Sequence, residues 1–459
     1  MGPNAAAVAP QGESAYAWLR LLVSLALMTI GGSGMYGITV VLPRIQQEFG
    51  VGRSDASFPY ALTLVGFGIG GILMGRLADR FGVMVPVLLG GVALGSGFLI
   101  AGSAHSLWQF NLAQGLLIGL LGTSATFAPL VADTSQWFTR RRGIALAICM
   151  SGNYVAGALW PPVTQHMVEL WGWRSAYAAI GYFCFASILP LAWVLKRRAP
   201  MAVVTLTPNP GSAADGAGAG AGIAAAAASS PATRSAVSER PLNLNPQWLT
   251  MLLSVAGLSC CVAMSMPQVH IVAYCTDLGF GATQGAQMLS LMLGAGIVSR
   301  LVSGWVSDHL GGLLTLLIGS LLQLLALLLF LPFKGLVPLY VISGLFGLFQ
   351  GGIVPCYALI VREYFTPQQA GARVGTVLMA TLFGMALGGW MSGAIFDWTG
   401  SYRAAFLNGI AFNLLNAAVV IFLLRRAWRL ALAHPGDGSR LGALVHRFSP
   451  STPPTYRTP

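Results

Sequence analysis

The sequence predicts an all-α membrane protein with twelve transmembrane helices in two pseudo-symmetric six-helix bundles. Of its 459 residues, 55% are hydrophobic and only 8% are charged, a composition that a soluble protein of this length could not carry on its surface. Apolar runs of about 20 residues, enough to cross a hydrocarbon core roughly 30 Å thick, recur along the chain. These runs cover approximately 18–42, 58–78, 83–104, 108–132, 143–167, 173–195, 248–273, 285–307, 313–333, 336–361, 372–396 and 403–424.

The runs fall into two groups of six, separated and flanked by polar segments. Residues 1–17 contain no basic residue and precede a full-length run, so we expect an N-terminal tail and no cleaved signal. The first six runs form the predicted N-terminal bundle, 18–198. Residues 199–246 change to Ala, Gly, Ser, Pro and Thr, which lack the large apolar groups of a core, so they predict a flexible linker. The remaining runs form the C-terminal bundle, 247–425, and 426–459 form a second tail.

Basic residues are distributed unequally between the two sides of the membrane. When both termini are placed in the cytoplasm, only five of the 25 Lys and Arg residues lie on the outer side, and one, Arg300, lies deep inside a run instead of near its end. This asymmetry follows the positive-inside rule and predicts cytoplasmic termini in a bacterial-type inner membrane. The net charge of +12 is therefore explained by topology and not by nucleic-acid binding. The five outer residues are Arg44, Arg53, Arg174, Lys334 and Arg403.

The two halves of the chain resemble one another. Three short motifs recur at a nearly constant offset of 227 to 229 residues, each at the same place in its half, which indicates a duplicated unit. Such repeats build carriers with a binding site where the repeats meet. The pairs are Gly75 to Gly82 with Gly304 to Gly311, Trp137 to Thr139 with Tyr364 to Thr366, and Trp173-Arg174 with Tyr402-Arg403.

These motifs resemble the major facilitator superfamily over about 18–425. The stretch GRLADRFG at 75–82 looks like the superfamily's signature between its second and third helices. The stretch WFTRRRGIALA at 137–147 is similar to the monocarboxylate porters and the oxalate/formate antiporters, and the segment from His270 to Gly279 also resembles this branch. The stretch RLVSG at 300–304 looks like the branch's eighth-helix motif, in which the arginine binds the substrate carboxylate.

The departures from that branch are informative. Gly296 stands where the eukaryotic monocarboxylate pattern has an aspartate, and Gly31 to Gly34 replaces its acidic motif in the first helix. Gly375 to Gly393 contains no charged residue, whereas the oxalate antiporter adds a lysine there. The proton-linked pattern of the fourth helix has an arginine where this chain has Asn111. The missing second cation favours a substrate with one carboxylate.

Arg300 is also the main candidate for an anion-binding residue when its position and its sequence neighbours are considered without the resemblance. It lies about seven residues, or roughly 12 Å, inside its apolar run, so its charge needs a partner. Small residues at helical spacing around it, Gly296, Ser299, Ser303 and Gly304, predict a recess for a small anion. The alternative is a structural salt bridge or close helix packing, but no Asp or Glu lies at comparable depth in any run.

Aromatic and amide side chains in other runs could complete a binding pocket, because pockets combine apolar walls with a few polar groups. Each could equally be an ordinary packing residue. The candidates are Tyr36, Phe127, Asn153, Tyr154, Gln350 and Phe383. His270 is a further candidate for the pocket and for proton movement, because imidazole titrates near neutral pH; a hydrogen-bonded interfacial role is the alternative.

Asp79, Arg80 and Asp308 lie at the predicted cytoplasmic ends of helices. Their charges are expected to contact nearby arginines or helix N-termini and to hold one gate closed. A structural helix cap is the alternative.

The sequence therefore predicts a secondary transporter for a small organic anion, most simply a monocarboxylate, that works by proton symport or anion exchange. No metal or other cofactor is expected, because the six cysteines lack metal spacing and no phosphate-binding loop occurs. An enzyme is not expected, since no acid, base and nucleophile converge. The alternatives are efflux of drug-like or amphipathic compounds and a sensor that signals through the linker. We expect a monomer in the lipid bilayer.

Overall fold

The computed structural model describes residues 14–138, 141–197 and 241–433, and the elements in these ranges are helices. Most of the predicted linker and C-terminal tail therefore lies outside the described residues, although the last helix continues beyond 425. The elements are α1 (Ala15–Gly31), α2 (Ser33–Phe49), α3 (Arg53–Phe81), α4 (Met84–Gly102), α5 (Leu107–Leu112), a π-helix η1 (Ala113–Thr123), α6 (Ala128–Trp137), α7 (Arg142–Val194), a 3₁₀ turn η3 (Pro241–Asn243), α8 (Pro246–Asp277), α9 (Ala282–Leu310), α10 (Gly312–Leu329), α11 (Leu336–Gln350), α12 (Ile353–Tyr364), α13 (Pro367–Thr399) and α14 (Tyr402–Ala433).

Eleven helical stretches of the described chain are long and apolar enough to cross a membrane, which confirms the all-α membrane class. One of them, Gly143–Val194, has 52 residues, roughly 78 Å at 1.5 Å per residue and more than twice the thickness of a bilayer core. Gly172 interrupts it with non-helical angles, φ 77° and ψ 160°. The two runs predicted at 143–167 and 173–195 lie on either side of Gly172. A twelfth crossing within this stretch remains a prediction.

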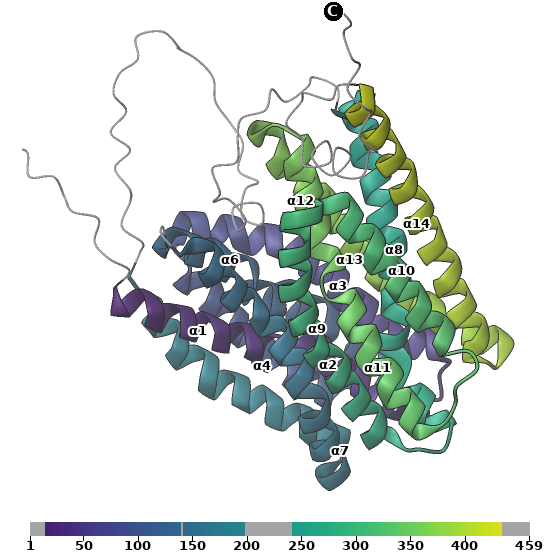
Figure 1. Ribbon diagram of the computed structural model, residues 1–459. Helices are drawn as coiled ribbons and strands as arrows, with labels where there is room; N and C mark the ends of the chain where they lie inside the picture. Colours follow the sequence, from purple (N-terminus) through teal and green to yellow (C-terminus); the bar gives the residue numbers. More distant parts are fainter. Residues whose placement is uncertain (1–13, 139–140, 198–240, 434–459) are drawn as a thin grey trace, which may run out of the picture.

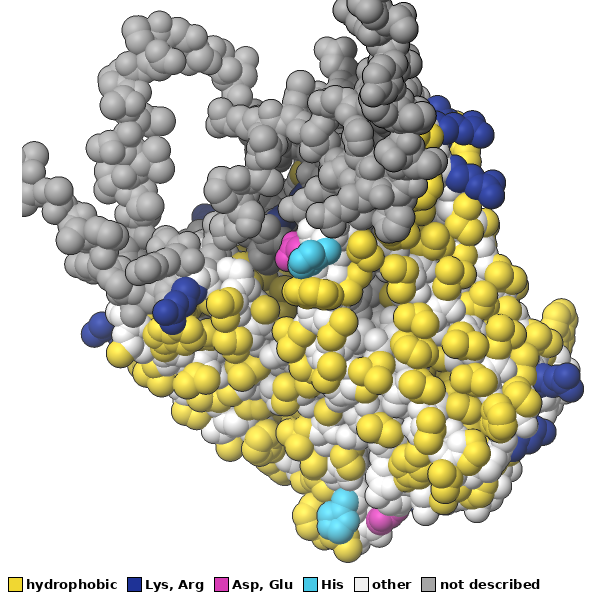
Figure 2. Space-filling view, viewed as in Figure 1, with side chains coloured by type: hydrophobic (Ala, Val, Ile, Leu, Met, Phe, Trp, Pro, Cys, Tyr) yellow, Lys and Arg dark blue, Asp and Glu magenta, His cyan; other side chains and the backbone are white. Residues whose placement is uncertain are grey.

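The outer surface of the helices is apolar, as expected for contact with lipid. Large hydrophobic side chains such as Leu301, Trp305 and Val337 are more than half exposed. Figure 2 shows hydrophobic side chains over most of one face, with charged side chains near its edges. This is the inverse of a soluble protein, in which such a surface would aggregate.

The helix ends repeat between the two halves. Left-handed glycines follow equivalent helices at Gly50 and Gly279, and again at Gly82 and Gly311, each pair 229 residues apart. Only glycine adopts a positive φ at little cost, so the same turn is required at the same place in each half. We call residues 15–197 the N-half and residues 241–433 the C-half; in Figure 1 they stand side by side, and the second runs from teal through green to yellow.

An interrupted helix of the C-half packs against α9. The helix α11 ends at Gln350 and α12 begins at Ile353, with Gly351 and Gly352 between them. A Cβ at Gly351 would lie 2.4 Å from the carbonyl oxygen of Gly296, and a Cβ at Gly352 would lie 1.9 Å from Oγ of Ser303. Side chains are therefore excluded at both glycines, and the chain break packs directly on α9 next to Arg300.

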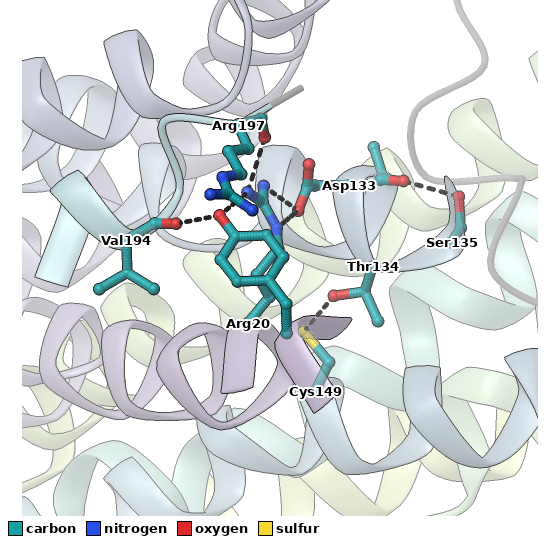
Figure 3. Close-up of polar contacts among 9 residues, drawn as sticks. Arg20, Asp133, Thr134, Ser135, Cys149, Val194 and Arg197 are labelled. Carbon is teal, nitrogen blue, oxygen red and sulfur yellow. Dashed lines mark hydrogen bonds and ion pairs between the residues drawn. The ribbon is translucent and has the colours of Figure 1, made fainter. Parts of the chain in front are cut away.

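A buried ion pair of the N-half joins α1 to α6, and its arginine also contacts the chain just after α7 (Figure 3). Arg20 of α1 donates from Nη2 to Oδ2 of Asp133 at 2.7 Å and from Nε at 3.2 Å, and from Nη1 to the carbonyl oxygen of Arg197 at 2.7 Å. Only 2% of the Arg20 side chain is exposed. The hydroxyl of Tyr16 donates to the carbonyl oxygen of Val194 at 2.6 Å. The first turns of α1, the helix α6 and the end of α7 are thereby held together at one face, which we call the terminal face.

The substitution Asp133→Asn is expected to destabilise the N-half, because it leaves the buried Arg20 cation without a counter-charge. Removing one partner of a buried pair costs roughly 3–5 kcal/mol. The matched control is Glu48→Gln, which breaks the pair of Glu48 with Arg174, whose side chains are both more than one-third exposed, and is expected to cost about 1 kcal/mol or less. Thermal unfolding of the purified protein in detergent measures both; equal losses of stability in the two variants would contradict the structural importance of Arg20.

Candidate functional site

Arg300 lies in α9, half-buried, against an aromatic ring of the other half. Its guanidinium carbon is 4.5 Å from the ring centre of Tyr154, which belongs to α7. The Nε atom of Arg300 is buried and has no hydrogen-bond partner. Among the described residues, no carboxylate forms an ion pair with it. The structural salt bridge considered from the sequence therefore has no partner here.

Tyr154 occupies one side of the recess that was predicted from the small neighbours of Arg300. A Cβ at Gly296 would lie 2.4 Å from Cε1 of Tyr154, so the ring fills the space beside Gly296. The hydroxyl of Tyr154 donates to the carbonyl oxygen of Gly351 at 3.3 Å. A Cβ at Gly304 would meet no described atom within 4 Å. The recess is therefore closed by Tyr154 on the Gly296 side and open on the Gly304 side.

Two further predicted residues lie beside this pair. Tyr36 of α2 is buried and lies within electrostatic range of Arg300 and Tyr154, and its hydroxyl contacts the side chain of Asn153. A Cβ at Gly157 would lie 2.9 Å from Cζ of Tyr36. The structure thus brings Tyr36, Asn153 and Tyr154 of the N-half to Arg300 of the C-half.

Gln350, the last residue of α11, is buried with 1% exposed surface. Its Oε1 accepts a hydrogen bond at 2.9 Å from Nε2 of Gln268 in α8. Its own Nε2 is buried without a partner. The sequence prediction missed Gln268. Its position as a glutamine inside an apolar run could have marked it as a candidate pocket residue. The adjacent carbonyl of Gly351 accepts from Tyr154, so Gln350 lies next to the Arg300 site along the chain.

Two predicted aromatic residues are not brought to Arg300 by any described contact. Phe127 is half-buried and packs edge-on against Phe67, with ring centres 5.5 Å apart. Phe383 of α13 is 55% exposed. A binding role for either residue remains a prediction.

His270 of α8 belongs to a different cluster. It is fully buried, with Nε2 2.8 Å from the carbonyl oxygen of Gly389 and Nδ1 3.1 Å from the hydroxyl of Tyr402. A carbonyl only accepts, so Nε2 carries the hydrogen, and in the neutral imidazole Nδ1 accepts from Tyr402. Its hydrogen bonds join it to the face opposite the terminal face, and its proposed role in proton movement remains a prediction.

Arg53 is the centre of this opposite-face cluster and joins the two halves. It comes from the start of α3 and binds Asp277, at the end of α8, bidentately with two distances of 2.6 Å. It also donates to the hydroxyl of Tyr402 at 2.6 Å and lies over the ring of Phe396 at 4.1 Å. Bidentate arginine–carboxylate pairs are among the strongest polar contacts in proteins. We call Arg53, Asp277 and Tyr402 the latch.

A second carboxylate caps a helix of the other half. Asp397, near the end of α13, accepts from the backbone nitrogens of Arg53 at 2.7 Å and Ser54 at 2.8 Å, and from Oγ of Ser54 at 2.7 Å. The N-cap residue of α3, Gly52, makes no side-chain cap. Asp397 therefore supplies the negative charge that a helix N-terminus favours, from across the boundary between the halves.

The same arrangement occurs on the other side of the boundary. Thr283, near the start of α9, donates its hydroxyl to Oε1 of Glu169 in α7. Thr283 follows Ser54 by 229 residues, and Asp397 follows Glu169 by 228. The halves are thus joined at the opposite face by two equivalent hydroxyl–carboxylate contacts.

The latch itself breaks this symmetry. In the N-half, Arg174 pairs with Glu48 at 2.6 Å, and the indole nitrogen of Trp173 also donates to Glu48. All three residues of this cluster belong to the N-half.

The C-half carries a copy of that cluster 229 residues later, as Asp277, Tyr402 and Arg403. There the carboxylate of Asp277 is bound by Arg53 of the N-half, while Arg403 is exposed and has no ion pair with a described residue. Because Trp173 pairs with Tyr402 in the repeat, the sequence could have indicated that Asp277, Tyr402 and Arg403 lie together. It could not have indicated that Arg53 of the N-half binds Asp277.

The predicted gating residues lie away from these contacts. Asp79, Arg80 and Asp308 are exposed, and within the described chain neither aspartate forms an ion pair. The described hydrogen bonds that α3 and α9 make with the other half lie near the latch, and Arg300, which contacts Tyr154, lies between the two ends of α9. Gating by Asp79, Arg80 and Asp308 remains a prediction for a different arrangement of the halves.

No group of three or more potential metal ligands occurs among the described residues, and all six cysteines are free and buried.

Comparison with known proteins gives one family. The family model described as Major Facilitator Superfamily matches residues 22–344 and 315–441. The chain is similar to monocarboxylate transporter 13 of Rattus norvegicus, with 27% identity over 80% of this chain and 78% of that protein. It is also similar to monocarboxylate transporter 11 of Mus musculus, with 26% identity over 90% and 88%. The MFS-type transporter pynF of Aspergillus niger is 23% identical over 79% and 78%.

Proposed function

Because the chain belongs to the Major Facilitator Superfamily and is a multi-pass membrane transporter, not an enzyme, we propose that it carries a small organic anion with one carboxylate by alternating access. Relatives named as monocarboxylate transporters support the substrate class. The proposal rests on Arg300 and on the way in which the two halves meet around it.

The observation that carries the proposal is the unsatisfied cation of Arg300. A charge inside a membrane helix is costly unless it is paired, yet Arg300 contacts a neutral ring and keeps a buried Nε without an acceptor. A guanidinium is planar and can hold a carboxylate with two parallel hydrogen bonds. A bound carboxylate would supply the missing acceptor and the missing charge together.

A second unsatisfied donor supports the assignment. Nε2 of Gln350 is buried and has no acceptor, and Gln350 precedes Gly351, the residue bonded to Tyr154. An anion with a further acceptor atom beside its carboxylate could satisfy both donors. Tyr36 and Asn153 would form the opposite wall from the N-half.

Alternating access follows from the position of the contacts. In this arrangement the latch and the Asp397 cap join the halves at the opposite face, so the site at Arg300 would be reached from the terminal face. Rocking of one half against the other would release the latch and close the terminal face, where Asp79, Arg80 and Asp308 lie. We propose that the terminal face is cytoplasmic in a bacterial-type inner membrane, on the basis of the distribution of basic residues, and that the transporter works as a monomer.

Flux into proteoliposomes tests the function and the coupling. Wild-type protein is reconstituted and offered labelled acetate, propionate, lactate and benzoate, the dicarboxylates oxalate and succinate, and an amphipathic cation, each with and without an imposed pH gradient. We expect saturable flux of at least one monocarboxylate and little flux of the dicarboxylates. Accumulation driven by the pH gradient would indicate proton symport, whereas exchange without it would indicate antiport. Flux of the amphipathic cation alone would contradict the proposal and support efflux; protein-free liposomes are the control.

A further inference from the structure

We propose that Tyr154 is a positioning residue, which holds Arg300 ready for the anion across the boundary between the halves. This inference rests on the proposed function. Tyr154 makes two contacts with the C-half, through its ring to the guanidinium of Arg300 and through its hydroxyl to the carbonyl oxygen of Gly351. Both contacts come from one side chain of α7, so the ring is fixed at both its face and its end.

Gly296 makes this arrangement possible. Residues 296 and 300 are four positions apart and lie on the same face of α9, so a side chain at 296 would lie beside Arg300. A Cβ at Gly296 would be 2.4 Å from Cε1 and 2.8 Å from Cδ1 of Tyr154. The partner of Arg300 at this place therefore comes from the other half and not from its own helix.

An aromatic partner acts on an arginine differently from a carboxylate. The ring attracts the cation through its face but contributes no formal charge, so Arg300 keeps its full positive charge. The ring face offers no oxygen acceptor to the N–H groups of the guanidinium, so a carboxylate could still accept two of them. Tyr154 thus orders the cation without competing for its donors.

The partnership also depends on the relative position of the halves. Tyr154 moves with the N-half, and Arg300 moves with the C-half. Rocking would change the distance between the ring and the guanidinium. The Arg300 side chain would therefore be held in place more firmly in one access state than in the other. Tyr154 should accordingly affect the apparent affinity for the anion more than the amount of folded protein.

The test compares variants at this contact. The substrate is whichever of acetate, propionate, lactate and benzoate the wild-type protein carries, and initial rates of its uptake into proteoliposomes give KM and Vmax. Tyr154→Leu removes the aromatic face and is expected to raise KM roughly 3- to 30-fold, with Vmax within about twofold. Tyr154→Phe keeps the ring and loses only the bond to Gly351, so its KM should stay within about threefold of wild type. The matched control is Tyr182→Leu, also in α7, where the tyrosine is 64% exposed and KM should not change.

A double variant separates positioning from general packing. Gly296→Ala should raise KM because its Cβ displaces the ring, but adding it to Tyr154→Ala should raise KM no further, because the ring is already absent. If the effects of Gly296→Ala and Tyr154→Ala on KM add in the double variant, the positioning role is wrong. It is also wrong if Tyr154→Leu keeps the wild-type KM and only lowers the yield of folded protein. If transport is unchanged in Arg300→Ala, or if wild-type protein carries none of the four acids, the proposed function fails and this inference fails with it. Loss of transport in Arg300→Ala with no change of KM in Tyr154→Leu removes this inference alone.

Discussion

Substitution of Arg300 by alanine is expected to abolish monocarboxylate flux, with a fall in Vmax/KM of at least about 100-fold, since a desolvated charge pair contributes roughly 3–5 kcal/mol. Arg300→Lys keeps the charge but loses the planar pair of donors and the contact with the Tyr154 ring, so we expect only a small part of the flux to return. Initial rates in proteoliposomes measure both variants.

The stability of these variants distinguishes a binding role from a structural one. Arg300 has a buried donor without a partner, so its removal should leave the thermal stability in detergent unchanged or higher. Arg403→Ala, which removes an exposed arginine of the opposite face, is the matched control and should transport normally. If Arg300→Ala transports at the wild-type rate, Arg300 does not bind the anion; if the variant loses transport and unfolds at a lower temperature than wild type, Arg300 is structural.

Substitution of Arg53 by alanine is expected to open the opposite face. It removes both hydrogen bonds to Asp277 and the bond to Tyr402. Asp277 is one-third exposed, so we expect a loss of about 1–3 kcal/mol, which shifts the ratio of open to closed states by roughly 5- to 150-fold.

A buried cysteine placed at the boundary would report this shift. Ser265 of α8 is fully buried and contacts Tyr60 of α3. In Ser265→Cys, labelling by a membrane-impermeant maleimide from the opposite face should be slow, and it should accelerate at least about fivefold when Arg53→Ala is added. The control is Arg174→Ala, which breaks the equivalent pair inside the N-half and should not accelerate labelling. Equal labelling rates in the Arg53 and Arg174 variants would show that the latch does not hold the halves together.

The fold was predictable because its signals are local. Runs of about 20 apolar residues, the glycine at each repeated helix end and the short motifs of each half can each be read within a short stretch of chain, and comparing the two halves then shows the repeat. The interruption at Gly172 agrees with the predicted gap between two runs. The π-helical segment of η1 could not be foreseen, because a shift in backbone hydrogen bonding leaves no mark on hydropathy.

The site was predictable only in part, for a physical reason. Arg300 is conspicuous because a charge in an apolar run is costly wherever it points. The contact of Arg53 with Asp277 joins residues 224 positions apart, and both residues read as ordinary loop and helix-end charges in the sequence. The role of Gly296 was likewise misjudged in part: we expected space for an anion, but the ring of Tyr154 occupies that side. Contacts between the halves depend on how two rigid units meet, which neither unit encodes alone.

The charge of Arg300 also has an electrical consequence. A neutral ring is its partner, so the empty centre carries one positive charge in the interior of the membrane, whereas the same centre with a bound monocarboxylate carries none. Each elementary charge moved across the full membrane potential contributes about 2.3 kcal/mol per 100 mV. Any displacement of the empty site through that field is therefore assisted or opposed by the voltage, while a site loaded with the monocarboxylate and no proton crosses without electrical work. Voltage would then act on the return of the empty carrier and not on the step that moves the anion.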